Sequence, residues 1–168
     1  MINLDELDKI LPQGAFSTYD MEAMLEPLQS LTSDDIYLEI GVDKGKSLAF
    51  ARAVSEAQIY GIDIEDKLDK SYKTEEPIYF QQIESTEASK KWKKPISILF
   101  IDGDHTEEGV KADWDSWSPH VKKGGVIFFH DADATSPGVE KLVRELKGTF
   151  QRDITGDDRC SMAWVIKK

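Results

Sequence analysis

The chain has 168 residues and a formal net charge of −11 at pH 7. Its length fits one domain, and its hydrophobic (40%) and charged (32%) fractions are typical of a globular protein rather than a disordered one. The acidic balance argues against binding to a nucleic-acid backbone, which needs a basic face. The single cysteine, Cys160, excludes an internal disulfide and a multi-cysteine zinc site.

The N-terminal stretch, residues 1–34, predicts an amphipathic piece and then a helix that begins at the capping pair Ser17 and Asp20. We expect this stretch to form a helical cap at one edge of a ligand site, beside a main domain at residues 35–168. The chain has no signal-peptide pattern and no apolar run near the ~20 residues that a membrane span needs. We therefore expect a cytoplasmic protein that binds neither membrane nor nucleic acid.

Strands and helices alternate in the pattern of the rest of the chain. The predicted strands are residues 36–40, 58–64, 78–82, 96–101 and 125–130, and the predicted helices are 48–57, 86–93, 107–117 and a segment from Pro137. Near-continuous apolar runs such as Ile98–Ile101 are typical of parallel strands covered on both faces. Residues 149–155 and 161–167 predict a closing hairpin with its turn at 156–158. The sequence therefore predicts a doubly wound α/β fold, with a mostly parallel seven-stranded sheet and a C-terminal antiparallel hairpin.

The first predicted strand leads into a glycine turn, Glu39-Ile40-Gly41-Val42-Asp43-Lys44-Gly45-Lys46-Ser47, and then into a helix. Such a turn lets backbone approach a nucleotide-like ligand. The Gly-x-Gly-x-x-Gly pattern for a dinucleotide is missing, as is the Gly-Lys-Ser/Thr pattern for a triphosphate. Carboxylates stand where a pyrophosphate would require positive potential. We expect a nucleoside-like ligand without phosphate that offers hydrogen-bond donors or positive charge.

Acidic residues follow all five predicted strands, at the edge where parallel sheets bind ligands. They are Glu39, Asp63, Glu84, the run Asp102-Gly103-Asp104-His105 and the run His130-Asp131-Ala132-Asp133. Asp63 is placed to bind the two hydroxyls of a ribose, and the alternative is that it caps a loop. Glu84 and Ser85 are placed to meet a purine amino group, and the alternative is that Ser85 caps the next helix.

The segments Tyr37–Ser47 and Ile59–Ile64 resemble the cofactor-binding half of class I S-adenosylmethionine-dependent methyltransferases. The segment Ile98–Asp131, with its Ile-Asp-Gly-Asp-His run, is similar to a bacterial subgroup often found near polysaccharide and antibiotic-sugar gene products. The resemblance covers residues 35–168 and implies a Rossmann-like methyltransferase fold with S-adenosylmethionine as cofactor. The positive charge of its sulfonium suits an acid-lined pocket.

The resemblance also implies roles for individual residues at the cofactor. The cofactor-binding residues would be Gly41, Gly45 and Ser47 in the turn, Glu39 near the methionine amino group, Asp63 at the ribose, Ile64, Glu84 and Ser85 at the adenine, and Asp102 at the methionine end.

Metal-dependent O-methyltransferases resemble this chain in the acids after strands four and five. Asp102 and Asp131 occupy the matching positions, whereas the usual third ligand, an asparagine, is Ala132 here. Asp133 is our candidate for the third ligand of Mg²⁺ or Mn²⁺, and the other substitutes are Asp104, His105 and His130. The alternative is that the histidines orient loops through hydrogen bonds and that no metal binds.

Catalysis at this edge would need a group that accepts a proton from the acceptor hydroxyl. His105 and His130 suit that role because an imidazole titrates near neutrality, and Asp131 would frame the site. We therefore expect methyl transfer to a hydroxyl oxygen of a small molecule or sugar. The alternatives are a non-catalytic module that binds S-adenosylmethionine and an NAD-dependent oxidoreductase. The tryptophans Trp114, Trp117 and Trp164 suit a core or an interface, and an interface would imply a homodimer.

Overall fold

The computed structural model describes residues 2–72, 78–151 and 162–168. The strands in these ranges form one sheet in the order β3-β2-β1-β4-β5-β7-β6. They are β1 (Ile36–Ile40), β2 (Gln58–Asp63), β3 (Ile78–Gln82), β4 (Ile96–Ile101), β5 (Val121–His130), β6 (Thr149–Phe150) and β7 (Met162–Ile166). Strands β1 to β5 pair in parallel, and β7 runs antiparallel to β5 and β6. The predicted doubly wound fold with closing antiparallel strands is confirmed.

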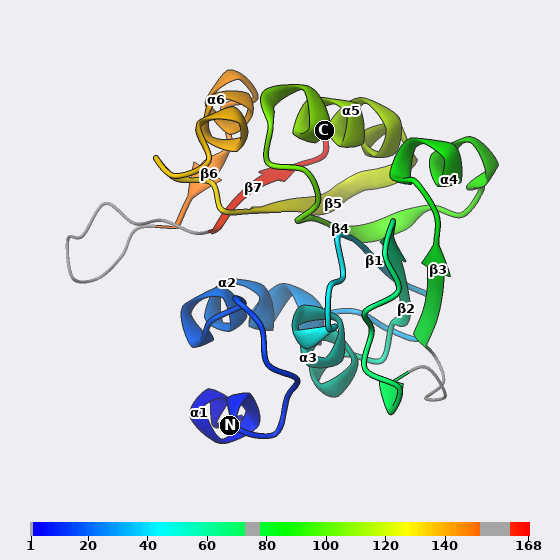
Figure 1. The fold of residues 1–168 in the computed structure, drawn as a ribbon, viewed down its shortest axis with the longest axis vertical. Coiled ribbons are helices and arrows are strands. Elements are labelled where there is room, and N and C mark those ends of the chain that lie inside the picture. The colour runs from blue at the N-terminus through cyan, green and yellow to red at the C-terminus, as the bar shows by residue number, and fades with distance from the viewer. Residues whose placement is uncertain (1, 73–77, 152–161) are drawn as a thin grey trace.

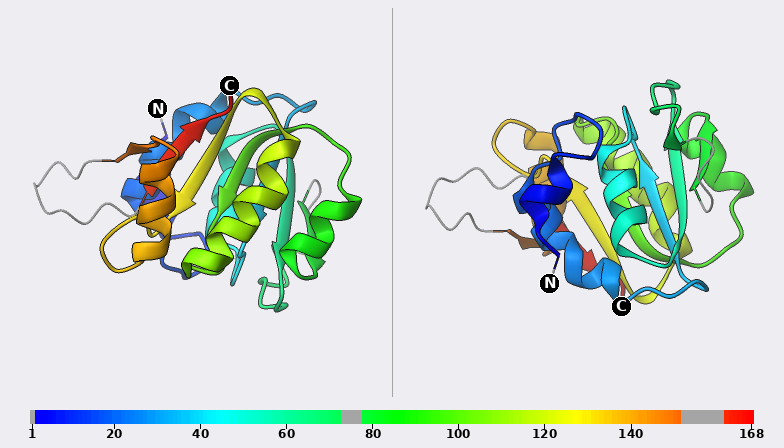
Figure 2. Two further views of the ribbon diagram at one scale, coloured as in Figure 1. Left: turned by 90° about the horizontal axis from the view of Figure 1, so that it is seen from above. Right: turned by 90° about the horizontal axis from the view of Figure 1, so that it is seen from below.

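Helices cover both faces of the sheet (Figures 1 and 2). On one face lie α1 (Leu4–Asp8), α2 (Thr18–Gln29) and α3 (Lys46–Val54), and on the other lie α4 (Ser85–Lys91), α5 (Glu107–Trp117) and α6 (Pro137–Glu145). A 3-10 turn, η2 (Ser118–His120), joins α5 to β5. Every residue of β1 and β4 is buried, which explains why these strands are nearly continuous apolar runs. Within the described part of the chain, no helix combines the length and apolar character that a membrane span requires.

The strands match their predicted bounds closely, and the largest difference is at β5. This strand begins at Val121, four residues before the predicted start. The prediction missed its first part because Lys122 and Lys123 are polar. The pairing of β4 with β5 is irregular between Ile96 and Ile98, and Gly124 has a positive φ of 79°. At the C-terminus β6 and β7 pair as predicted. The turn predicted at 156–158 and Cys160 lie outside the described residues.

The N-terminal helices belong to the hydrophobic core on their face of the sheet. Met21, Met24 and Leu28 of α2 are buried in one cluster with Phe50 of α3 and Tyr37 of β1. Burial of each such side chain stabilises the fold by about 1.5–3 kcal/mol. The predicted capping box at the start of α2 is present. Helix α2 is therefore held firmly against the sheet, which fixes the position of the segment that precedes it.

Candidate active site

A cavity of about 610 Å³ lies at the carboxyl ends of the parallel strands. β1 and β4 are neighbours at its centre, and the chain leaves them toward opposite sides of the sheet, which is where open α/β sheets bind ligands. The cavity is strongly acidic. Its charged lining consists of Asp43, Asp63, Glu65, Glu84, Asp102, Asp104, Asp113 and Asp131 against Lys44, Lys46 and Lys67, together with His105 and His130. This lining suits a ligand that carries positive charge and hydrogen-bond donors.

The two glycines of the turn are required by the packing of the protein itself. Gly41 and Gly45 have φ values of 82° and 88°. A Cβ on Gly41 would lie 2.1 Å from the carbonyl oxygen of Asp102, and one on Gly45 would lie 2.3 Å from Leu68 Cδ1. Gly41 thereby lets the loops after β1 and β4 lie side by side. Both glycines also line the cavity, so they shape its wall whether or not a ligand approaches them closely.

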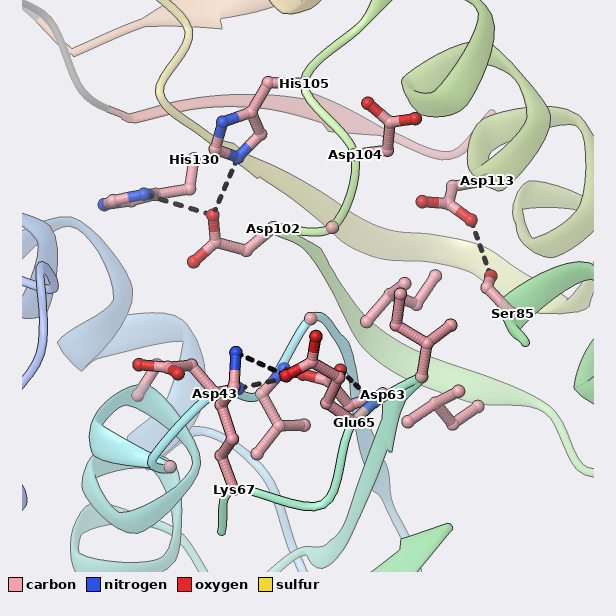
Figure 3. Close-up of a pocket in the computed structure, with 18 of the residues that line it drawn as sticks. Asp43, Asp63, Glu65, Lys67, Ser85, Asp102, Asp104, His105, Asp113 and His130 are labelled. Carbon is pink, nitrogen blue, oxygen red and sulfur yellow. Dashed lines mark hydrogen bonds and ion pairs between the residues drawn. The ribbon is translucent and has the colours of Figure 1, made fainter. Parts of the chain in front are cut away.

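Asp63 holds the glycine turn in place. Its Oδ2 accepts hydrogen bonds from the backbone N–H groups of Val42 (2.8 Å) and Asp43 (2.9 Å), and its Oδ1 accepts one from Glu65 (2.9 Å; Figure 3). Asp43 has a left-handed φ of 46°, and the bond to Asp63 helps to hold it there. The loop-capping alternative for Asp63 is therefore observed. The same residue lines the cavity.

Glu39 lies beneath the turn rather than on the cavity wall. It is fully buried, and its two carboxylate oxygens accept hydrogen bonds from the hydroxyls of Tyr37 (2.6 Å) and Ser47 (2.7 Å). Burial raises the pKa of Glu39 to about 8, against the opposing effect of these two hydrogen bonds. Ser47, in contrast, lines the cavity. A ligand at the turn would therefore meet Ser47 first, with Glu39 behind it.

Glu84 and Ser85 have different partners at the start of α4. Glu84 is the N-cap, and its carboxylate accepts a hydrogen bond from the backbone N–H of Glu87 (3.0 Å). The alternative in which Ser85 caps this helix is wrong. The Ser85 hydroxyl instead donates to Asp113 Oδ1 (2.6 Å) and accepts from the indole N–H of Trp117 (2.8 Å).

Asp113 is a residue of the cavity wall that the sequence analysis missed. It is only 6% exposed, and burial raises its pKa to about 6 despite the hydrogen bond from Ser85. Asp113 stands three residues after Val110 and four before Trp117, both of which are buried in the core. The sequence does show an acid on the apolar face of this amphipathic helix, and that pattern could have identified Asp113 as a candidate site residue.

Two carboxylates and two imidazoles alternate at the ends of β4 and β5. His105 Nε2 lies 3.3 Å from Asp102 Oδ1, and its Nδ1 lies 3.5 Å from Asp131 Oδ2. His130 Nδ1 lies 3.3 Å from Asp102 Oδ1 and 3.5 Å from Asp131 Oδ1. Figure 3 shows Asp102 between the two rings. His105 is partly exposed at the cavity, whereas His130 is buried.

A third carboxylate reaches His130 from the N-terminal segment. Asp20 of α2 is buried, and its Oδ2 lies 3.4 Å from His130 Nε2. Burial opposes protonation of His130, but hydrogen bonds with Asp102, Asp131 and Asp20 outweigh it and raise the pKa of this imidazole to about 12. This raised pKa argues against the role of general base that the sequence suggested for His130. The buried ring instead contacts three acids, Asp102, Asp131 and Asp20.

Asp102, His105 and Asp131 form a group that could hold a metal ion, since each offers a ligand atom and these atoms lie within 4.8 Å of one another. Asp133 stands apart from this group. Its Oδ1 accepts hydrogen bonds from the backbone N–H and the hydroxyl of Thr135, in the turn before α6. Asp131 has a left-handed φ of 50°, a strained conformation that is common at functional sites. Oxygen ligands with one imidazole suit Mg²⁺ or Mn²⁺.

Comparison with known proteins places this chain in a family. The model of a family described as a methyltransferase domain matches residues 38–132, which run from β1 to the loop after β5. A curated relative, protein R132 of Acanthamoeba polyphaga mimivirus, is 38% identical over 58 residues, a stretch that covers 31% of this chain and 26% of that protein.

Solved methyltransferase structures share the whole fold at low sequence identity. MycE from the mycinamycin biosynthetic pathway, in complex with Mg and S-adenosylhomocysteine, has a TM-score of 0.72 at 21% identity. The match covers 99% of this chain and 54% of MycE, so the chain spans about half of its length. An rRNA methylase from Streptococcus thermophilus has a TM-score of 0.69 at 13% identity, with 89% of this chain and 93% of that chain covered. The chain belongs to the methyltransferase domain family and has the fold of class I S-adenosylmethionine-dependent methyltransferases.

Proposed function

We propose that this protein transfers the methyl group of S-adenosylmethionine to a hydroxyl oxygen of a small molecule or sugar, with the help of a divalent cation. The observation that carries the proposal is the group of Asp102, His105 and Asp131 at one end of the acidic cavity. MycE supports it, because structures of that enzyme contain Mg and S-adenosylhomocysteine, in one case with mycinamycin VI. The net charge of −11 disfavours RNA as the acceptor, although rRNA methylases share the fold.

The cofactor would lie across the ends of β1, β2 and β4. Asp63 would bind the ribose hydroxyls, and the side chain of Ile64, 66% exposed, offers an apolar surface to the adenine ring. Gly41, Gly45 and Ser47, with Glu39 behind them, would surround the methionine part. Asp102 would then lie beside the sulfonium, where a carboxylate stabilises the positive charge of the cofactor.

Methyl transfer requires the acceptor oxygen, the methyl carbon and the sulfur to stand in line, so the acceptor must enter beside Asp102 and Asp131. These two residues and His105 would hold the cation, which would lower the pKa of an acceptor hydroxyl when bound. The hydroxyl would then release its proton to solvent as its oxygen takes the methyl group, and S-adenosylhomocysteine would leave. His130 would fix the orientation of both carboxylates from behind. Residues 1–34 would cap this end of the site, because Gln13–Phe16 line the cavity and Asp20 contacts His130.

A transfer assay with methyl-labelled S-adenosylmethionine tests the proposal. The acceptors are a catechol and a methyl glycoside with free hydroxyls, each in Mg²⁺, in Mn²⁺ and in excess chelator. We expect labelled O-methyl product that depends on the metal. Product formation that survives chelation would contradict the role of the cation. Calorimetric binding of S-adenosylmethionine without transfer to any hydroxylated compound would instead support the non-catalytic module.

A further inference from the structure

Asp113 is a buried acid of the cavity that the proposed transfer reaction does not use. It comes from α5 and lies on the side of the cavity formed by α4, away from His105 and His130 (Figure 3). Two other acids of the same wall, Glu84 and Asp104, act on Asp113 through their charge. Each of them accepts a backbone N–H, from Glu87 and from Thr106 respectively. The proposed reaction assigns no role to Asp113.

The carboxylate of Asp113 is held in one orientation. Ser85 donates its only hydroxyl proton to Oδ1, and Ser85 is itself fixed by the indole N–H of the fully buried Trp117. In the described part of the chain this is the one hydrogen bond that Asp113 makes. Oδ2 faces Gly103, where an added Cβ would lie 3.1 Å away. Oδ2 is thus an oriented acceptor at the cavity wall, and a buried carboxylate oxygen favours a donor.

The cavity that Asp113 lines also has apolar side chains in its wall, namely Ile62, Ile64, Ile83 and Ala112. Apolar side chains next to a single polar acceptor suit a flat heteroaromatic ring that carries an amino group. Of the two residues that the sequence offered for that amino group, Glu84 caps α4 through its Oε2, and the hydroxyl of Ser85 donates to Asp113.

We propose that Asp113 accepts a hydrogen bond from the 6-amino group of the adenine of S-adenosylmethionine and so selects an adenine nucleoside over a 6-oxo purine. The proposal rests on the proposed function, because it requires the cofactor to lie in this cavity. Asp113 is a specificity residue, with Ser85 as the residue that positions it. A 6-oxo group would place an acceptor against the carboxylate, which leaves two acceptors without a proton between them.

Calorimetric titration compares S-adenosylhomocysteine with S-inosylhomocysteine, in which a 6-oxo group replaces the 6-amino group. We expect wild-type protein to prefer the adenine ligand by about tenfold or more. In Asp113→Asn, the amide oxygen can keep the bond from Ser85 while the amide nitrogen faces the ligand as a donor. The preference should therefore fall at least about tenfold or reverse. The control is Asp115→Asn on the exposed side of α5, where the preference should not change.

Each outcome decides a separate point. If wild-type protein binds S-adenosylhomocysteine and S-inosylhomocysteine with equal affinity, the role of Asp113 is overturned. It is also overturned if Asp113→Asn keeps the wild-type preference for the adenine ligand. Failure of wild-type protein to bind S-adenosylhomocysteine at all would overturn the proposed function, and with it this inference. If Asp113→Asn does not fold by its thermal unfolding curve, Gly103→Ala replaces it, because the new methyl group crowds Oδ2. An unchanged preference in that variant overturns the inference as well.

Discussion

The two ends of the cavity use the same type of side chain in different ways. At the end formed by β2 and α4, Asp63 and Asp113 are held by neutral donors, namely backbone N–H groups and a serine hydroxyl. At the end formed by β4 and β5, Asp102 and Asp131 are held by two imidazoles. A neutral donor orients a carboxylate without compensating its negative charge, so the carboxylate can still accept a hydrogen bond from a ligand. A protonated imidazole compensates that negative charge, as a metal ion would. In the proposed function, the end whose acids have neutral partners binds the nucleoside, and the end whose acids have imidazole partners performs the chemistry.

Glu39 lies below both ends, and its titration should change the stability of the whole fold. Its pKa is about 8 in the folded protein, above the 4.5 of an unperturbed glutamate, so the folded state binds the extra proton. The resulting stability is fully present below pH 4.5 and is lost as the pH rises toward 8, a loss of roughly 4 kcal/mol. Glu39→Gln should remove this part of the pH dependence. Urea unfolding at pH 5, 6.5 and 8 measures it, and identical slopes in the two proteins would contradict the burial argument.

Gly41 joins the two ends, because it lets the loops after β1 and β4 meet. Gly41→Ala places a Cβ 2.1 Å from the carbonyl oxygen of Asp102 and should destabilise the fold by about 3 kcal/mol. Gly124→Ala is the matched control, since Gly124 has a similar φ of 79° and nothing lies within 4 Å of its added Cβ. It should cost only about 1 kcal/mol. Chemical denaturation compares the two, and equal losses would show that φ strain alone matters.

Asp131→Asn should weaken metal binding at the end formed by β4 and β5 and leave nucleoside binding at the other end unchanged. Removing a charged ligand is expected to weaken Mn²⁺ binding by about 100-fold, while the affinity for S-adenosylhomocysteine should stay within about threefold. Calorimetric titration of each ligand gives both numbers. Loss of the nucleoside affinity together with that of the metal would mean that the two ends are not independent.

Asp133→Asn should have the smallest effect. Asp133 bonds to Thr135 and lies outside the group formed by Asp102, His105 and Asp131. We expect its Mn²⁺ affinity to remain within about twofold of the wild-type value. A loss comparable to that of Asp131→Asn in the same calorimetric titration would restore Asp133 as a ligand.

Local patterns were sufficient to predict most of the fold. The buried runs of β1 and β4 are apolar because helices cover both faces, and Ser17 with Asp20 form the expected capping box. The start of β5 was hidden because Lys122 and Lys123 are exposed and polar. The hydrophobic pattern of a sequence depends on burial, so it does not identify strand residues that are exposed and polar.

Tertiary contacts account for what the sequence did not reveal in the site. Asp20 meets His130 across 110 positions of the chain, and Ser85 meets Asp113 across 28. Asp133 follows Asp131 by only two residues, yet the left-handed φ of Asp131 and the turn at Thr135 separate it from the group of Asp102, His105 and Asp131. The strand ends could be listed from the sequence, but the partners of each acid depend on loop conformation.

Nuclear magnetic resonance of S-adenosylmethionine bound to the Mn²⁺-loaded protein shows which part of the cofactor lies near the cation. Paramagnetic broadening falls steeply with distance from the ion, and the Mg²⁺-loaded protein gives the reference spectrum. If Asp102, His105 and Asp131 hold the cation at the methyl end, the S-methyl signal should broaden far more than those of adenine H2 and H8. Broadening of the adenine signals equal to or greater than that of the methyl signal would contradict the assignment of the two ends.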